Sequence, residues 1–291
     1  MVEHPGSVGQ LAELLRQGGY LADRGLATAL YLSMSLPRPI LLEGEVGVGK
    51  TEAAKVLASV FGRRLIRLQC YEGIDTNQAL YEWDYARQML QIRALSEHEV
   101  AEGAVDQLFG PKFLLERPLL AAVRAGDQAV LLIDEVDRAD DEFEAFLLEV
   151  LSDFQVSIPE IGTITAPAPP LVVLTSNRTR ELHDALKRRC LYHWIGYPPA
   201  EREVEIVLIK EPGVSQTLAR KVVAAVHRLR ELDLAKPPGV AETIDWARTL
   251  DLLGGTDLDP QLAEDTLGAV VKERDDLDLV RENLEEITSG A

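Results

Sequence analysis

The most constraining feature of the sequence is a glycine-rich segment that follows a short apolar run. Residues 41–54 read LLEGEVGVGKTEAA, in which Gly44, Gly49, Lys50 and Thr51 match the pattern G-x-x-x-x-G-K-[ST]. Glycines are needed in such a loop because its backbone N–H groups must wrap a polyphosphate closely, in front of a helix N-terminus. The apolar run before the loop and the helical pattern after it provide the strand–loop–helix context of a phosphate-binding loop.

The residues of this loop have separate expected roles toward ATP or ADP. Lys50 is predicted to bridge the β- and γ-phosphates, and the Thr51 hydroxyl is predicted to ligate Mg²⁺. A glycine-rich turn can match the pattern by chance, but the flanking strand and helix argue against that reading. The residues predicted to contact the nucleotide are Gly44, Glu45, Val46, Gly47, Val48, Gly49, Lys50, Thr51 and Glu52.

Two carboxylates end another apolar run, in the sequence AVLLIDEVDRAD at 129–140. Asp134 is placed to hold Mg²⁺ through water, and Glu135 is placed to orient or deprotonate an attacking water molecule. Such a pair could instead cap the helix that follows it. Glu135 beside Asp134 favours water as the phosphate acceptor, so the pair indicates a hydrolase rather than a kinase.

A third apolar run, LVVLTSNRTR, ends in Asn177. An amide at the end of a strand near the two carboxylates is able to bond the attacking water or the γ-phosphate. Asn also begins turns routinely, and the two roles are compatible. The order of the strands in the sheet decides how close Asn177 comes to the acidic pair.

Composition restricts the partners of the chain. The 291 residues carry a net charge of −18, which argues against binding to a nucleic-acid backbone and favours a protein partner. Cys70 and Cys190 lack a metal-type spacing and are predicted to be reduced, buried thiols. No apolar run approaches the roughly 18 residues that span a bilayer, so we expect a soluble, cytoplasmic protein without a membrane span.

The hydrophobic periodicity predicts an α/β fold. Short apolar runs between longer helical patterns are typical of a parallel sheet with helices on its faces. The predicted strands are 39–43, 65–69, 130–134, 171–176 and 192–197, and the predicted helices before residue 199 are 7–35 (interrupted at Gly18 and Gly19), 51–61, 113–125 and 141–153.

No strong strand signal occurs after Pro198-Pro199. We therefore predict an α/β nucleotide-binding domain at 1–198 and an all-helical domain at 199–291. Helical patterns occupy 201–210, 215–234 and 242–253, and the charged stretch 271–291 reads as a solvated helix that frays.

Together, these motifs resemble the AAA+ ATPases. GEVGVGKTEAAK and IDEVDRADDEFEAFLLEVLSDFQV are similar to the MoxR branch, whose pattern runs G-E-P-G-V-G-K-T and D-E-I-N-R-A. Within that branch, LQCYEGIDTNQALYEWDYARQML and ALKRRCLYHWIGYP most resemble the ATPase that assists maturation of the copper and molybdenum centre of aerobic carbon monoxide dehydrogenase. The resemblance covers roughly 15–250 and implies a five-stranded parallel sheet of order 5-1-4-3-2 with a helical lid.

The same resemblance implies a ring, usually a hexamer, in which an arginine from the neighbouring subunit completes each ATP site. That arginine maps best onto Arg189, with Arg188 as the alternate. The other interpretation is that both arginines are surface charges at the end of a helix. Arg138 is a further candidate for the subunit boundary. By analogy, Tyr20 and Leu21 line the adenine.

The sequence departs from the family pattern at two places. Most relatives carry a lid arginine that touches the γ-phosphate, but GVAETIDW places Thr243 or its neighbours there, and Arg248 lies one turn further on. Asp137 stands where the branch usually has Asn, which adds charge near the expected metal.

Insertions within 71–112 and at 154–169 are the places where such proteins engage a target, and the second reads as a hairpin around Pro159 to Gly162. Tyr81, Trp83 and Tyr85 in the first could grip a polypeptide or simply pack the insertion onto its domain.

The expected function is Mg²⁺-dependent ATP hydrolysis that remodels a protein client. The resemblance implies a molybdenum enzyme as that client and a von Willebrand factor A domain protein as a partner. The first alternative is a nucleotide-gated binding module with little turnover. The second is a nucleic-acid motor, and the acidic net charge argues against it.

Overall fold

The computed structural model describes residues 4–94 and 106–289. The chain divides into two compact units, and both contain separate stretches of sequence. The first, here called the sheet unit, holds the residues up to Leu11, Arg24–Glu43 and Ala54–His193. The second, here called the helical unit, holds Ala12–Asp23, Gly44–Ala53 and the residues from Trp194 onward.

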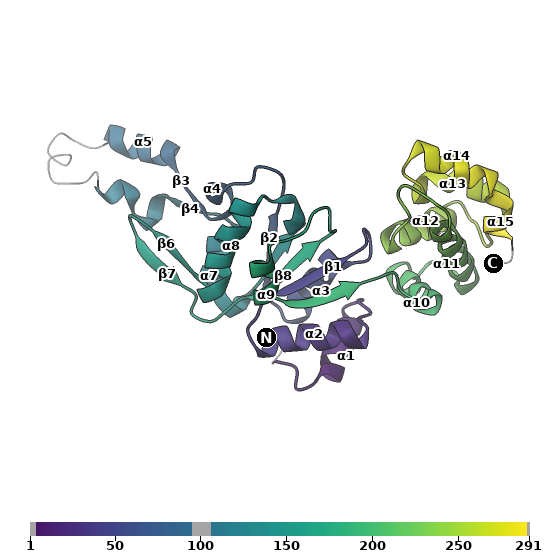
Figure 1. The fold of residues 1–291 in the computed structure, drawn as a ribbon, viewed down its shortest axis with the longest axis horizontal. Coiled ribbons are helices and arrows are strands. Elements are labelled where there is room, and N and C mark those ends of the chain that lie inside the picture. The colour runs from purple at the N-terminus through teal and green to yellow at the C-terminus, as the bar shows by residue number, and fades with distance from the viewer. Residues whose placement is uncertain (1–3, 95–105, 290–291) are drawn as a thin grey trace. The chain divides into compact units, whose positions relative to one another are not determined.

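A five-stranded sheet has the order β2-β5-β8-β1-β9. Its strands β1, β2 and β8 are labelled in Figure 1. When the five strands are numbered one to five along the chain and read from the other edge, the order is the predicted 5-1-4-3-2. The pairs β1·β8, β2·β5 and β5·β8 are parallel, and every residue of β5 and β8 is buried. The strand bounds are β1 Ile40–Gly44, β2 Arg64–Gln69, β5 Ala129–Asp134, β8 Leu171–Ser176 and β9 Leu191–Ile195.

Most helices associated with the sheet match the predicted patterns, but one predicted helix starts too early, and α9 was not among the predicted helices. The pattern at 7–35 forms two helices, separated near Gly18 and Gly19 as expected. The predicted helix 113–125 is wrong at its start, because Leu114–Glu116 forms strand β4 and the helix begins at Pro118. Pro118 suits the first helical turn and keeps the residue before it extended. The bounds are α1 Val8–Gln17, α2 Arg24–Ser35, α3 Lys50–Val60, α7 Pro118–Ala125, α8 Asp141–Asp153 and α9 Asp184–Arg189.

The first predicted insertion forms a small subdomain of the sheet unit, and its part at 95–105 lies outside the described residues. Strands β3 (Tyr81–Trp83) and β4 pair antiparallel, and α5 (Tyr85–Ala94) follows β3. Trp83 is buried and meets Phe109 edge to face at 5.4 Å between ring centroids. The remaining elements are α4 Thr76–Ala79 and the 3₁₀ turns Asp106–Phe109 and Pro111–Phe113.

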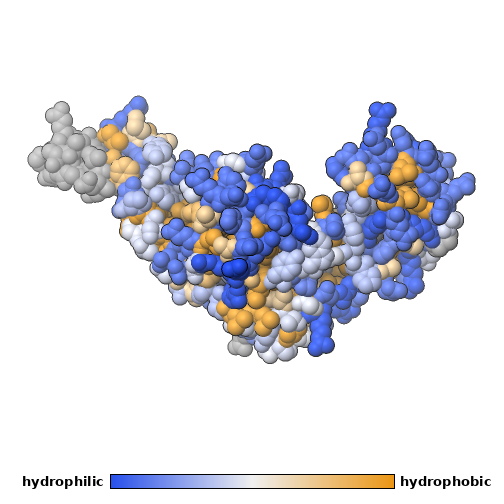
Figure 2. Space-filling model, viewed as in Figure 1, coloured by the Kyte–Doolittle hydropathy of each residue, from blue (hydrophilic) through white to orange (hydrophobic). Residues whose placement is uncertain are grey.

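Helix α5 presents apolar side chains to solvent. Tyr85 is 62% exposed, and Met89, Leu90 and Ile92 are exposed as well. Apolar residues gather over α5 in Figure 2. Tyr81 is half-buried against Trp83, so Tyr81 and Trp83 take part in packing, whereas Tyr85 is exposed.

The second predicted insertion is a hairpin, as expected. Strands β6 (Gln155–Ile158) and β7 (Gly162–Thr165) pair antiparallel around the turn at 159–161. The apolar face of the hairpin is buried through Val156 and Ile158, which join the core of the sheet unit.

The helical unit buries a second core between its helices, around Trp246. The charged stretch at 271–289 does not form one solvated helix as expected, because it forms α14 and α15 and buries Val280, Leu284 and Ile287. The helix bounds are α10 Ala200–Lys210, α11 Gln216–Glu231, α12 Val240–Leu252, α13 Pro260–Val270, α14 Arg274–Glu282 and α15 Leu284–Thr288. In the described part of the chain, no helix has the length and apolar composition to cross a membrane.

Cys70 and Cys190 are free and buried, as predicted. Burial raises the pKa of both thiols to about 12, and the Asp134 carboxylate adds to the shift at Cys70. A raised pKa leaves little thiolate at pH 8, and the thiolate is the reactive form. We therefore expect Ellman's reagent at pH 8 to label two thiols in denaturant and none in the native protein within minutes. Rapid labelling of the native chain would contradict the buried placement.

Candidate functional site

The glycine-rich loop lies in the helical unit and joins β1 to α3 along the chain. Gly44 allows a close backbone approach, because a Cβ there would lie 2.0 Å from the carbonyl oxygen of Ile195. Gly47 has φ +76°, and a Cβ on it would lie 2.9 Å from Glu242 Oε2. The N–H of Ala241 donates to the Gly47 carbonyl at 3.1 Å. The start of α12 therefore packs directly on the loop.

Lys50 is the first residue of α3 and is only 6% exposed. Its Nζ donates to the carbonyl oxygens of Gly44 at 2.8 Å and Glu45 at 2.6 Å. The amine is thus held within the loop, at the N-terminus of an eleven-residue helix. A buried cation beside a glycine-rich turn and a helix N-terminus fits a polyphosphate, because all three attract anions.

Tyr20, which was predicted to line the adenine, packs beside the loop. A Cβ on Gly49 would lie 3.6 Å from its ring carbon Cε2. Burial, with the carboxylates of Asp23 and Glu52 adding to it, raises the pKa of the Tyr20 phenol. Leu21 is half-buried. Glu52 accepts from Lys210 Nζ of α10 at 2.6 Å, which attaches α10 to the first turn of α3.

In the sheet unit, Asp134 ends β5 and is 3% exposed. Its Oδ2 accepts from Arg67 Nε at 2.9 Å and from Arg67 Nη2 at 2.5 Å. Its Oδ1 accepts from the Thr175 hydroxyl at 2.6 Å. Residues on the strands on both sides of β5 therefore fix the carboxylate.

Glu135 follows Asp134 and has a left-handed backbone, with φ 54° and ψ 50°. Its N–H donates to the Thr175 hydroxyl oxygen at 2.9 Å. Its Oε2 lies 3.4 Å from Nη1 of Arg138, three residues later. Arg138, a candidate for a subunit boundary, thus forms a partly exposed ion pair with Glu135 of its own chain.

Asn177 comes directly after β8, on the strand next to β5. Its N–H donates to Asp137 Oδ2 at 3.2 Å, and both the N–H and the hydroxyl of Thr179 donate to the same oxygen at 2.8 Å. The structure therefore brings Asp134, Glu135 and Asn177 together at the carboxyl ends of neighbouring strands. Asp137 holds the segment after β8 in place.

Arg188 and Arg189 are exposed in the last turn of α9. Arg38 donates to the backbone carbonyls of Arg188 at 2.9 Å and Arg189 at 3.3 Å. The helix end is therefore anchored through its backbone, while both guanidinium groups face solvent.

In the helical unit, Thr243 lies in the stretch 239–246, where the family resemblance leads us to expect a lid arginine. It is buried and donates to Glu203 Oε1 at 2.6 Å. Glu203 is fully buried and also accepts two bonds from Arg230 at 2.7 Å each. Arg248 is exposed, and its Nη1 lies 4.0 Å from Oε1 of Glu211. The Thr243 position is thus part of a buried polar network within the helical unit.

Mg²⁺ favours oxygen ligands and usually takes one or two from protein, with the rest from phosphates and water. Taken separately, the Asp134 carboxylate of the sheet unit and the Thr51 hydroxyl of the helical unit are each oxygen donors of this kind. Within residues 4–94 and 106–289, no group of three or more His, Cys, Asp or Glu residues could hold a metal ion.

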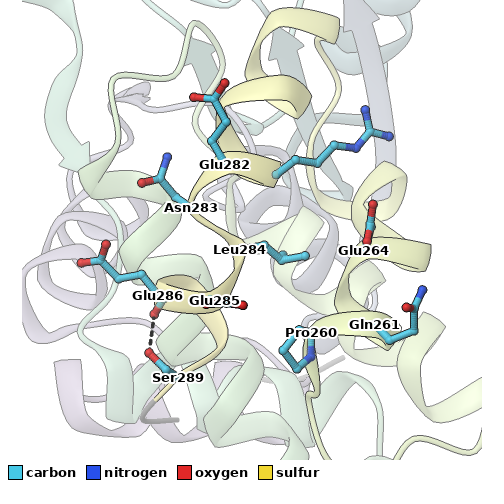
Figure 3. Close-up of a pocket in the computed structure, with 10 residues that line it drawn as sticks. Pro260, Gln261, Glu264, Glu282, Asn283, Leu284, Glu285, Glu286 and Ser289 are labelled. Carbon is cyan, nitrogen blue, oxygen red and sulfur yellow. Dashed lines mark hydrogen bonds between the residues drawn. The ribbon is translucent and has the colours of Figure 1, made fainter.

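A separate pocket of about 800 Å³ lies between α13 and the segment from α14 to α15 (Figure 3). Its lining includes Glu264, Glu282, Glu285 and Glu286, and none of the predicted site residues. Its acidic lining makes it a poor place for a nucleotide, because like charges repel.

Sequence reasoning missed Arg67 and Thr175, which contact Asp134. For Thr175 the available signal was a polar residue near the carboxyl end of the otherwise apolar strand LVVLTS. Ligand sites in open α/β sheets lie at the carboxyl ends of the strands. Arg67 lies in the middle of RLIRLQ, where no comparable signal marks it.

The sheet order, the glycine-rich loop after β1 and the acidic end of β5 define an AAA+ P-loop NTPase fold. Residues 39–190, more than half of the chain, match the family described as AAA domain (dynein-related subfamily). The chain belongs to this family.

Curated relatives with sequence similarity are distant. The chain is 28% identical over 202 residues to "Chaperone MoxR1" of Mycobacterium tuberculosis, covering 67% of this chain and 46% of that protein. It is 26% identical over 235 residues to "Denitrification regulatory protein NirQ" of Pseudomonas aeruginosa, covering 77% and 79%. It is 24% identical over 201 residues to "Protein NorQ" of Paracoccus denitrificans, covering 67% and 65%. The chain thus spans less than half the length of the MoxR1 chaperone.

Among solved structures, two mutants of RuvB from Thermotoga maritima share the fold. Each has a TM-score of 0.51, with 17% and 16% sequence identity, covering 99% of this chain and 81% of theirs. At this identity the likeness concerns the fold alone.

Proposed function

We propose that the protein is a Mg²⁺-dependent ATPase that uses hydrolysis to remodel a protein client. The observation that carries the proposal is the buried Lys50 amine inside a glycine-rich loop at a helix N-terminus. The acidic pair at the end of β5 adds the groups needed for hydrolysis. Family membership supports ATPase activity, and the name of the MoxR1 relative supports the chaperone role.

The proposal assigns each site residue a task. Lys50 leaves the carbonyls of Gly44 and Glu45 to bind the β- and γ-phosphates. Bound Mg²⁺ would neutralise charge on the phosphate oxygens, with Thr51 and Asp134 as its protein ligands. Glu135 accepts a proton from, or orients, the attacking water, and Asn177 bonds that water or the γ-phosphate.

The proposal includes a ring of subunits, with a hexamer as the expected size. Arg189 is the residue we assign to the neighbouring ATP site, and Arg188 is the alternate. Both guanidinium groups are exposed at the anchored end of α9, which supports a role toward another subunit. Residues 199–291 would act as the helical lid.

The insertion around α5 is our proposed contact with the client. Its exposed Tyr85, Met89, Leu90 and Ile92 form the kind of apolar surface that marks protein interaction sites. The finer proposals are a molybdenum enzyme as the client and a von Willebrand factor A domain protein as a partner. They depend on the resemblance of the loop sequences to maturation ATPases.

The first experiment is ATP hydrolysis by the purified protein. We expect phosphate release with Mg²⁺ and none with excess EDTA. Lys50→Ala should weaken ATP binding about 10- to 100-fold, because it removes a charged hydrogen-bond donor from a buried site. Lys55→Ala, on an exposed position of the same helix, is the matched control and should bind ATP like the wild type. Equal binding by the Lys50→Ala variant and wild type would contradict the assignment of the loop.

One observation favours a second candidate function, a nucleotide-gated assembly module with little turnover. Thr243 is bound to Glu203 in the stretch where the family resemblance leads us to expect a lid arginine, and Arg248 lies near Glu211. Light scattering with ATP, compared with turnover in the same sample, distinguishes the candidates. Assembly without phosphate release would support the module.

A further inference from the structure

Thr175 lies at the point where backbone pairing between β5 and β8 ends. The last paired residues of that ladder are Ile133 and Leu174. On its other side, Thr175 is still in register with Leu42 of β1. The backbone of Thr175 is therefore held by β1, while its side chain contacts Asp134, the last residue of β5, and Glu135 just beyond it.

The Thr175 hydroxyl connects both members of the acidic pair. It donates to Asp134 Oδ1 at 2.6 Å and accepts from the Glu135 N–H at 2.9 Å. A hydroxyl carries one hydrogen, so its donation to Asp134 leaves its lone pairs for the amide of Glu135. Thr175 is 2% exposed, and water therefore cannot readily replace either bond.

These bonds hold Glu135 in an uncommon conformation. A left-handed backbone is unfavourable for a residue with a Cβ and persists only where the surroundings fix it. The hydrogen bond from the Glu135 N–H to the Thr175 hydroxyl oxygen fixes the backbone at Glu135, the residue that has the left-handed conformation. The direction of the Glu135 side chain therefore depends on the Thr175 hydroxyl.

We infer that Thr175 is a positioning residue whose single hydroxyl orients Asp134 toward the metal and Glu135 toward the attacking water. This inference rests on the proposed ATPase function. It assigns Thr175 a role distinct from that of Asn177, which follows it by two residues. Partners that orient metal-binding carboxylates commonly affect metal affinity or activity by about 10- to 100-fold when they are replaced.

The test compares Thr175→Val, which keeps the side-chain shape but lacks the hydroxyl, with Thr175→Ser, which keeps the hydroxyl. Mn²⁺ is titrated into each ADP-bound protein and followed by electron paramagnetic resonance, and kcat and KM for ATP are measured separately. We expect Thr175→Val to weaken Mn²⁺ binding and lower kcat, each about 10- to 100-fold, with little change in KM. Thr175→Ser should remain within about threefold of the wild type, because it preserves the donor and the acceptor.

Thr266→Val is the matched control, because the Thr266 hydroxyl is also buried and accepts from Trp246 Nε1 at 2.8 Å within the helical unit. It should lower Tm without changing Mn²⁺ affinity. If Thr175→Val does not fold, Thr175→Cys replaces it and is compared with Thr175→Ser, because cysteine has the shape of serine but its thiol is a weak donor. Wild-type Mn²⁺ affinity and kcat in the variant that lacks the hydroxyl would overturn the inference. If the wild type lacks turnover, the proposed function fails, and the Mn²⁺ titration still decides the role of Thr175.

Discussion

Replacing Glu135 by Gln should lower kcat for ATP hydrolysis by about 10² to 10⁴, because the amide cannot accept a proton from the attacking water. ATP binding should be retained, since the loop and Lys50 are unchanged. Phosphate release measures the first effect, and fluorescence titration with a labelled ATP analogue measures the second. The variant should therefore trap the ATP-bound state, which makes it suitable for isolating a bound client.

Glu142→Gln is the control for this experiment, because Glu142 is an exposed glutamate on the first turn of α8. Arg138→Ala is also needed, since Arg138 forms an ion pair with Glu135 that the amide would weaken. If only the loss of that ion pair mattered, Arg138→Ala would reproduce the defect. Turnover that survives Glu135→Gln would remove Glu135 from the role of catalytic base.

Replacing Arg189 by Ala should lower turnover by about 10³ to 10⁵, if this guanidinium completes the ATP site of a neighbouring subunit. Nucleotide binding to the variant's own loop should persist. Mixing it with Lys50→Ala subunits should restore hydrolysis, because the second variant donates an intact arginine to sites that still bind ATP. Phosphate release as a function of the mixing ratio provides the measurement.

Arg188→Ala is the matched control, being the adjacent exposed arginine on the same helix turn. Arg38 bonds the backbone carbonyls at this helix end, so neither substitution removes that anchor. A large defect in Arg188→Ala alone would transfer the role to that residue. If Arg189→Ala is defective and no mixture recovers activity, the action of Arg189 across subunits is excluded.

Much of the fold could be predicted because fully buried parallel strands leave a clear signal. The run LVVLTS became β8 at its predicted bounds, and the hairpin around 159–161 formed as expected. Leu114–Glu116 could not be recognised as a strand, since its partner β3 lies more than thirty residues earlier. The buried face of the charged stretch after residue 271 could not be recognised, because its apolar residues Val280 and Leu284 are spaced among many carboxylates.

The acidic part of the site was only partly predictable. Asp134 ends an apolar strand and Glu135 follows it, which local sequence reveals, and Asn177 directly follows another apolar strand. Arg67 and Thr175 contact Asp134 from the neighbouring strands β2 and β8. Contacts between strands depend on register, which a single sequence does not specify for parallel strands joined by long connections.

The close approach of Ile195 to Gly44 changes how the first glycine of the loop should be understood. A side chain there would collide with a carbonyl of β9 whether or not a nucleotide is bound. Loss of function on substitution at this position would therefore not by itself demonstrate a defect in phosphate recognition. Gly44 is required by the edge strand of the sheet. We therefore expect a related protein that no longer binds nucleotides to need this glycine in order to fold.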